Sequence, residues 1–166
     1  MKEDESNKKE TGFKILESVV IGATSGKRLV LKSESIFNSF IDSDFKNWDL
    51  ENWEEGRPEI DFLICEIDKD TPFPQMFTKI NSNLEELVVT QDQIIYFCEK
   101  YPGKINRDGC QVFFLIKRDK EYFVVGVSRT PNPNNLAVFV YRIDREVPIY
   151  ARYHHRLVIP DFSIKE

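Results

Sequence analysis

The feature that most constrains the fold is a series of four apolar segments near the end of the chain, at residues 110–118, 121–129, 136–143 and 148–159. They are rich in Val, Ile, Phe and Tyr, the residue types that favour strands. The connections between them are only a few residues long, and connections of that length join neighbouring antiparallel strands. The sequence therefore predicts a long antiparallel meander of four strands over residues 110–159.

Other β-rich segments precede the meander. Residues 14–21 and 28–32 flank a glycine-containing turn and are predicted to form an amino-terminal hairpin. Residues 60–67 are predicted to form a further strand, and a short helix is expected over about residues 73–80. The 13 Phe, 6 Tyr and 2 Trp residues of the chain predict a thick aromatic core beneath the sheet.

Two longer helices are predicted to cover one face of this sheet. Over residues 34–46 apolar side chains recur at helical spacing behind a possible Ser33 cap. Residues 91–101 show the same periodicity, and Thr90 with Gln93 fits a capping box. Because helices with one apolar face need a sheet to pack on, the sequence predicts an α+β fold.

The order of helix, strand, helix and four long strands is similar to that of the cone-shaped folds of the nuclear-transport-factor-2-like type. The similarity covers residues 34–159 and is one of topology alone, without a shared motif. It implies a sheet that curls into a cone. It implies no particular activity, since one fold supports many functions.

The chain is predicted to be a single domain over residues 12–166, preceded by a disordered polar tail over residues 1–11. That tail lacks the apolar core of a signal peptide. The longest apolar run, Leu136–Tyr141, has six residues, whereas a membrane span needs about 20. We therefore expect a cytoplasmic protein with no membrane association.

No cofactor or metal is predicted. The three cysteines, Cys65, Cys98 and Cys110, are widely spaced in apolar stretches and are expected to be buried free thiols. The acidic residues between Asp42 and Asp61 lack the ligand spacing of a calcium loop and are interpreted as a solvated surface.

The segment from Gly22 to Arg28 has a partial likeness to a phosphate-binding loop. A P-loop has four residues between its glycines and a Ser or Thr after the Lys. Here three residues separate Gly22 from Gly26, and Arg28 follows Lys27. The segment is therefore interpreted as a hairpin turn rather than a phosphate cradle.

Candidate binding residues lie in the last predicted strand. Alternate residues of a strand share a face, so Arg152, His154 and Arg156 would form a cationic stripe, which Arg142 extends if it emerges on the same face of a neighbouring strand. Such a stripe can bind phosphates, carboxylates or acidic protein segments. The alternative is that these cations pair with the chain's own acidic residues.

The opposite face of that strand carries Tyr153 and His155, which are weak candidates for acid–base catalysis if the sheet encloses a pocket. The alternative for His155 is a hydrogen-bonded structural histidine. His154 and His155 are adjacent and would point to opposite faces, so they are not expected to share a metal ion.

The charge distribution and the lack of a catalytic signature lead to the functional hypotheses. The net charge is −5, with −8 over residues 1–90 and +3 over residues 91–166. The leading hypothesis is a non-catalytic protein-interaction or adaptor domain, to which Trp48 and Trp53 offer exposed aromatic surface. The alternatives are an anion or nucleic-acid binder using the cationic stripe, and a small enzyme or ligand-binding cone. Nucleic acid is the less favoured partner, because an acidic chain repels phosphates.

Overall fold

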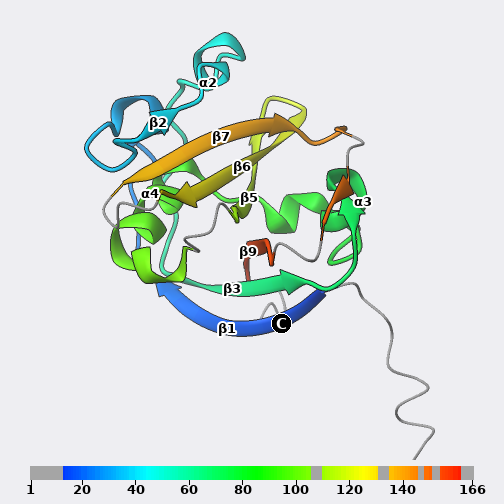
Figure 1. The fold of residues 1–166 in the computed structure, drawn as a ribbon. Coiled ribbons are helices and arrows are strands. Elements are labelled where there is room, and N and C mark those ends of the chain that lie inside the picture. Colours follow the sequence, from blue (N-terminus) through cyan, green and yellow to red (C-terminus); the bar gives the residue numbers. More distant parts are fainter. Residues whose placement is uncertain (1–12, 106–109, 131–134, 146–147, 151–153, 162–166) are drawn as a thin grey trace, which may run out of the picture.

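The computed structural model describes residues 13–105, 110–130, 135–145, 148–150 and 154–161. Within these residues the protein has an α+β fold built on one mixed, mostly antiparallel sheet of seven strands (Figure 1). The sheet is open and does not curl, so the cone expected from the order of elements is wrong. In spatial order the strands are β1 (Phe13–Ile21), β3 (Ile60–Ile67), β9 (Arg156–Pro160), β5 (Val112–Arg118), β6 (Glu121–Arg129), β7 (Leu136–Arg142) and β2 (Phe40–Ile41).

Short helices and a second, two-stranded sheet complete the described part of the fold. None of these helices is both long and apolar enough to cross a membrane. The helix expected over residues 73–80 is confirmed, with slightly earlier ends. The α-helices are α2 (Asp44–Asn47), α3 (Phe73–Thr78) and α4 (Gln91–Lys100); the 3-10 helices are η1 (Val30–Lys32), η2 (Leu84–Leu87) and η3 (Pro102–Lys104); the small sheet pairs β4 (Thr71–Pro72) with β8 (Pro148–Ile149).

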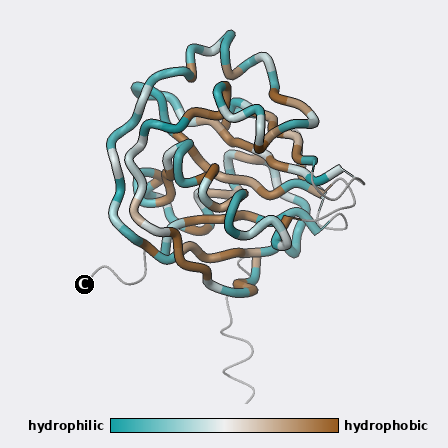
Figure 2. The backbone as a smooth tube through the Cα atoms, turned by 90° about the vertical axis from the view of Figure 1, so that its left-hand side faces the viewer, coloured by the Kyte–Doolittle hydropathy of each residue, from teal (hydrophilic) through white to brown (hydrophobic). Residues whose placement is uncertain are grey.

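The central strands are buried on both faces because consecutive residues in them are apolar. In β5, Val112, Phe114 and Ile116 enter one core cluster, whereas Phe113 and Leu115 enter another. Helix α4 contributes to the first cluster and α3 to the second, so helices lie on both faces of the sheet. Phe37 and Phe45 belong to the same cluster as α4, so the two segments predicted to share one face do pack into one core, although residues 34–46 are not a helix. Figure 2 shows the result, with hydrophobic segments running through the interior and hydrophilic segments in the outer loops.

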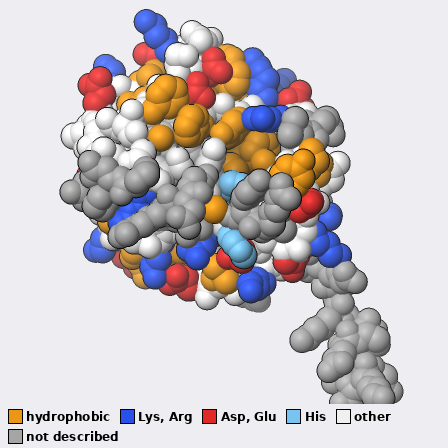
Figure 3. All heavy atoms as spheres, in the orientation of Figure 1, with side chains coloured by type: hydrophobic (Ala, Val, Ile, Leu, Met, Phe, Trp, Pro, Cys, Tyr) orange, Lys and Arg blue, Asp and Glu red, His pale blue; other side chains and the backbone are white. Residues whose placement is uncertain are grey.

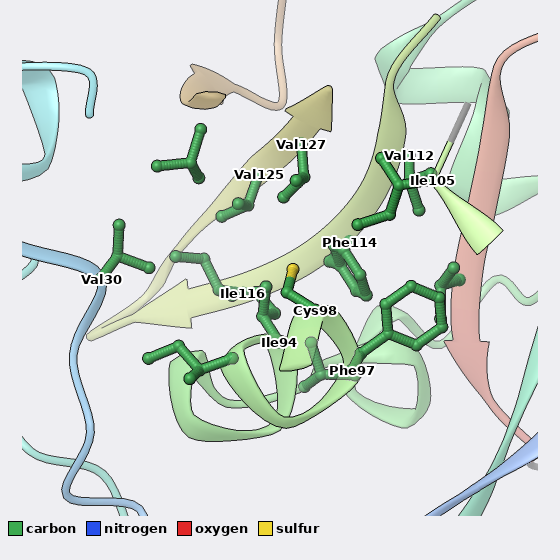
Figure 4. Packing of buried hydrophobic residues seen from close by; sticks show 14 of the residues in the cluster. Val30, Ile94, Phe97, Cys98, Ile105, Val112, Phe114, Ile116, Val125 and Val127 are labelled. Atoms are coloured by element: carbon green, nitrogen blue, oxygen red, sulfur yellow. The ribbon is translucent and has the colours of Figure 1, made fainter. Parts of the chain in front are cut away.

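Helix α4 confirms the helix predicted over residues 91–101. Its capping box is complete: Gln93 N donates to Thr90 Oγ1 at 3.1 Å, and Thr90 N donates to Gln93 Oε1 at 3.0 Å. The apolar side of α4 lies against β5, where Phe97 packs edge-on to Phe114 with ring centroids 5.4 Å apart (Figure 4). The cap and the apolar stripe therefore act together to fix where the helix begins.

Three of the four predicted meander strands are confirmed, because β5, β6 and β7 pair antiparallel in sequence order. The prediction of a fourth meander strand over residues 148–159 is wrong. The chain forms β8 first, and His154 has a left-handed conformation (φ 57°). Strand β9 then pairs antiparallel with β3 and parallel with β5. Leu157, Val158 and Ile159 are all buried, and consecutive buried residues require a central strand rather than an edge strand.

The helix predicted over residues 34–46 is also wrong. The chain instead makes a turn, then β2, then the single turn of α2. Phe37 and Phe45 are buried, as the apolar pattern required, but they reach the core from this irregular path. The Ser, Asn and Asp residues between them hydrogen-bond readily to nearby or distant backbone, which competes with helix formation.

Residues 38–42 cover the outer edge of β7. The Ser39 and Asp42 amides donate to β7 carbonyls at 3.0 and 2.9 Å. The Asn38 and Asp42 side chains accept from β7 amides at 3.4 and 3.1 Å. These contacts extend over Leu136–Val140, so a two-residue strand and two polar side chains pair this edge of the sheet.

The predicted amino-terminal hairpin does not form. Residues 14–21 lie in β1, but β1 pairs with β3 rather than with residues 28–32. The strand predicted over residues 60–67 is confirmed as β3. The second arm of the expected hairpin is bound to the start of α4 instead.

The three cysteines are buried and free, as predicted. Burial raises the pKa of Cys65 to about 12 and also raises the pKa of Cys98. A thiol needs a lowered pKa to act as a nucleophile near neutral pH, so these two side chains serve the core.

Candidate functional site

A groove opens where strands β9 and β5 separate. The two strands pair in parallel only where Arg156–Leu157 meet Val112–Phe113. Strand β9 then stays with β3 as far as Pro160, while Val88 takes the place beside β5 by bridging Leu115. The divergence leaves a groove of about 530 Å³.

Among the charged residues that line this groove, acidic ones outnumber basic ones. Five of its lining residues are Asp or Glu and one is Arg. They come from three segments that are far apart in the sequence. A cleft lined by charges of one sign concentrates the electrostatic field and attracts ligands of the opposite sign. We define the acidic groove by its lining residues: Arg57, Pro58, Glu59, Ile60, Asp61, Glu85, Glu86, Val88, Gln93, Pro160 and Asp161.

The carboxylates of the groove differ in how they are held. Glu85 accepts hydrogen bonds from Lys117 and Tyr122, which lower its pKa. In contrast, no hydrogen bond or ion pair joins the side chains of Glu59 and Asp61 to another residue in the part of the chain that the structure describes. These two carboxylates are therefore available to a ligand.

The acidic residues are spread along the groove. No group of three or more His, Cys, Asp or Glu side chains among the described residues is arranged to hold a metal ion. Between the acids lie apolar side chains, Ile60, Val88 and Pro160. An elongated ligand with separated positive charges and an apolar stem fits this arrangement better than a point charge does.

The first turn of α4 lies beside the groove and buries three consecutive polar residues. The Asp92 carboxylate, 3 % exposed, accepts from Gly26 N at 2.8 Å, from Ser25 Oγ at 3.2 Å and from Arg28 Nε at 2.7 Å. Burial acts to raise the pKa of Asp92, but the hydrogen bonds and the charge of Arg28 outweigh it and lower the pKa. Asp92 is thus an ionised, fully bonded structural carboxylate.

The segment from Gly22 to Arg28, which partly resembles a phosphate-binding loop, therefore binds a carboxylate of its own chain. Gly26 has a positive φ of 79°, and a Cβ added there would lie 2.2 Å from Glu54 O. Only glycine accommodates both the conformation and the contact. The amide and guanidinium that an external anion would use are occupied by Asp92.

Gln91 joins the same helix start to two other loops. Its Oε1 accepts from Val30 N at 3.0 Å, and its Nε2 donates to Leu50 O at 2.9 Å. Its backbone amide donates to Glu54 Oε1 at 2.8 Å. Burial raises the pKa of Glu54, although this hydrogen bond acts in the opposite direction. These bonds fix the loop that leads to Arg57 and the groove.

Gln93, the third polar residue, faces the groove. The residue is 2 % exposed and lines the groove wall. Its backbone amide and Oε1 are used in the capping box with Thr90. Among the described residues Nε2 has no hydrogen-bond acceptor. It is also not one of the unpaired side-chain atoms that are fully shielded from solvent, which are Thr24 Oγ1 and Arg156 Nε. The Gln93 amide therefore presents a donor to the open space of the groove.

The predicted cationic stripe does not form on one strand face. Arg156 begins β9, His154 lies in the preceding turn, and Arg152 is outside the described residues. His154 Nδ1 and Arg156 Nε approach the two oxygens of Glu66 at 3.3 and 4.0 Å. Both of these side chains therefore face a carboxylate of the chain itself.

Arg142 lies on β7, and β5 and β6 separate it from β9, so the expectation that it extends the stripe is wrong. Its guanidinium carbon is 4.5 Å from the centre of the Trp48 ring, and its NH1 is 3.1 Å from Glu121 Oε1. Trp48 is accordingly packed against the core, whereas Trp53 is 68 % exposed.

His155 has a structural environment. Its Nδ1 accepts from Gln111 N at 2.9 Å, and its ring lies 5.4 Å from that of Phe113. Burial lowers its pKa, so the ring is neutral at pH 7. His155 does not line the acidic groove. Figure 3 shows histidine side chains at the molecular surface, and Tyr153 lies outside the described residues.

Sequence reasoning recognised part of the groove without its role. Glu59 and Asp61 were interpreted as members of a solvated acidic surface. Their approach to Glu85, Glu86 and Asp161 depends on the position of β9, which the sequence did not predict. The one local signal was Gln93, which was recognised as a capping residue but not as a donor to a ligand.

Comparison with protein-family models, curated proteins and solved structures finds no match to this chain. No function can therefore be transferred from another protein.

Proposed function

We propose that this chain is a non-catalytic protein-binding domain whose acidic groove accepts a basic segment of a partner protein. The observation that carries the proposal is the charge of the residues that line the groove of about 530 Å³, of which five are Asp or Glu and one is Arg. Electrostatic complementarity of this kind increases association rates and selects the sign of the partner's charge.

The shape and chemistry of the groove support a Lys- or Arg-containing segment. The methylene stems of these side chains pack on apolar surface while their charged ends remain near carboxylates. Ile60, Val88 and Pro160 supply the apolar surface. The charge comes from Glu59 and Asp61, which have no side-chain partner among the described residues. The volume lies within the range of sites that enclose ligand-sized groups.

The two other hypotheses have less support. For catalysis, the candidate His155 is bonded to the backbone at Gln111 and does not line the groove. For anion binding, Arg142, His154 and Arg156 each approach a carboxylate of the chain. Catalysis and anion binding that involve residues outside the described part of the chain remain predictions.

The proposal can be tested by titrating the full chain with a capped peptide, acetyl-Ala-Lys-Ala-Lys-Ala-amide, followed by NMR chemical shifts. The amides of residues 57, 59–61 and 85–88 should shift. The double variant Glu59→Gln, Asp61→Asn should weaken binding by about five- to tenfold, since it removes two charges that face the ligand. Raising the salt concentration should weaken binding by the wild type more than by this variant.

A matched control is the double variant Glu34→Gln, Asp68→Asn, which makes the same change in net charge at two exposed acids outside the groove. It should bind the peptide within about twofold of the wild type, because neither residue lines the groove and salt screens interactions between separated exposed charges. Equal losses in the two double variants would mean that net charge alone attracts the peptide, and the proposal would then be wrong.

A further inference from the structure

We infer that the acidic groove is specific for polypeptide over simple cations, because the Gln93 side-chain amide donates a hydrogen bond to a backbone carbonyl of the bound segment. This inference depends on the proposed function and defines the chemistry of the partner further. It makes Gln93 a specificity-determining residue in addition to the capping residue of α4.

The side chain of Gln93 is held in place by hydrogen bonds to Thr90. Its backbone amide and its Oε1 both bond to Thr90, which fixes the side-chain orientation. The two N–H groups of Nε2 remain: the hydrogen bonds of Gln93 to other described residues outside the helix use its backbone amide and Oε1, and Nε2 is not among the unpaired atoms that are shielded from solvent. A buried amide donor is normally paired, so a ligand in the groove that lacks an acceptor leaves this donor unsatisfied.

The groove thus requires two properties of its ligand. Positive charge is needed near Glu59 and Asp61, and a hydrogen-bond acceptor is needed near Gln93. Metal ions and protonated polyamines carry charge but no acceptor. A peptide offers both, because each residue has a carbonyl oxygen and Lys or Arg supplies the charge. The spread of the carboxylates, with no group of three arranged around one ion, also favours an extended ligand.

The variant Gln93→Glu separates the two properties. Glu is the usual alternative to Gln at this position of a capping box, so it can keep the acceptor for Thr90 N. It replaces the free donor by a carboxylate oxygen and adds one negative charge. We expect this variant to bind spermidine more tightly than the wild type and to bind the capped Lys peptide about fivefold more weakly, as for a lost hydrogen bond.

The matched control is Arg57→Gln, which makes the groove more negative by the same one charge and leaves the Gln93 amide in place. Arg57 forms no side-chain ion pair with another described residue, so the substitution changes charge with little structural cost. This variant should bind both spermidine and the peptide more tightly. The measured quantity is the ratio of peptide affinity to spermidine affinity in the three proteins.

The outcomes distinguish the inference from the proposed function. A ratio that falls further in Gln93→Glu than in Arg57→Gln supports the inference, since the added charge alone acts in both variants. A ratio that is equal in Gln93→Glu and Arg57→Gln overturns the inference and leaves the proposed function standing. Binding of neither ligand at the groove overturns both. If Gln93→Glu does not fold, the wild type is titrated instead with peptides in which each backbone amide in turn is replaced by a thioamide, a weaker hydrogen-bond acceptor. The inference requires one position at which this replacement reduces affinity. Equal affinity for all of these peptides contradicts it.

Discussion

Two acidic regions lie at the start of helix α4, and the protein treats them in opposite ways. The Asp92 carboxylate is buried and takes its hydrogen bonds from Ser25, Gly26 and Arg28. The Glu59 and Asp61 carboxylates line an open groove and have no such bonds within the described residues. A charge removed from water has to be paired, whereas a charge at an open groove retains water until a ligand replaces it. The first region therefore supports the fold, and the second is free to bind.

The largest expected effect is that of Asp92→Ala, which should lower the free energy of unfolding by about 2–4 kcal/mol because it leaves buried donors without an acceptor. Asp92→Asn keeps an acceptor oxygen and should lose less. Urea denaturation at pH 7 measures both. A loss below about 0.5 kcal/mol for Asp92→Ala, the size of an ordinary surface change, would remove the distinction between the two regions.

The pH dependence of stability gives an independent control for the role of Asp92. Its pKa is lowered in the folded protein, so its charge stabilises the fold above the pKa of the unfolded chain, near 3.8. That contribution is lost as the pH falls below this value through the folded pKa. The wild type should therefore lose more stability than Asp92→Asn between pH 5 and the most acidic pH at which both proteins still fold. Parallel pH profiles would contradict the assignment.

Gly26→Ala is expected to have a smaller effect and to lower the free energy of unfolding by about 2–3 kcal/mol. The added Cβ meets the carbonyl oxygen of Glu54, and the positive φ is unfavourable for alanine. The matched control is Gly103→Ala, where a Cβ would have no neighbour within 4 Å. Thermal unfolding of the two variants should show a clear shift in Tm for the first and almost none for the second. Equal shifts would show that the loop holding Asp92 is not under steric constraint.

The smallest effect on stability is expected at the groove. Glu59→Gln and Asp61→Asn should each change the free energy of unfolding by less than about 0.5 kcal/mol, since neither carboxylate is bonded to another described residue. Urea denaturation of the single variants measures this. A loss above about 1 kcal/mol would mean that these carboxylates, like Asp92, support the fold.

The sequence predicted what depends on neighbours along the chain. Helix α4 was predicted because Thr90, Gln93 and the apolar spacing that follows are local signals. The same reasoning failed over residues 34–46, where the polar side chains bond to β7. Asn38 reaches a partner 98 residues away. No local periodicity reports a contact of that kind.

The sequence of strand β9 contains a signal for its central position in the sheet, and the prediction used only part of it. The alternation of residues 149–159 favoured a strand with one apolar face. Leu157, Val158 and Ile159 form a continuous apolar run, which is typical of a strand buried on both faces between neighbours. Because the position of β9 creates the acidic groove, the groove could not be predicted without it.

The pairing of the β7 edge by residues 38–42 also affects how the protein behaves at high concentration. An uncovered strand edge offers a row of unpaired amides and carbonyls to which a strand of another molecule can add. Here the Asn38 and Asp42 side chains occupy β7 amides that a short strand alone would leave open. Residues 38–42 therefore close the β7 edge over Leu136–Val140 to the addition of a strand from another molecule.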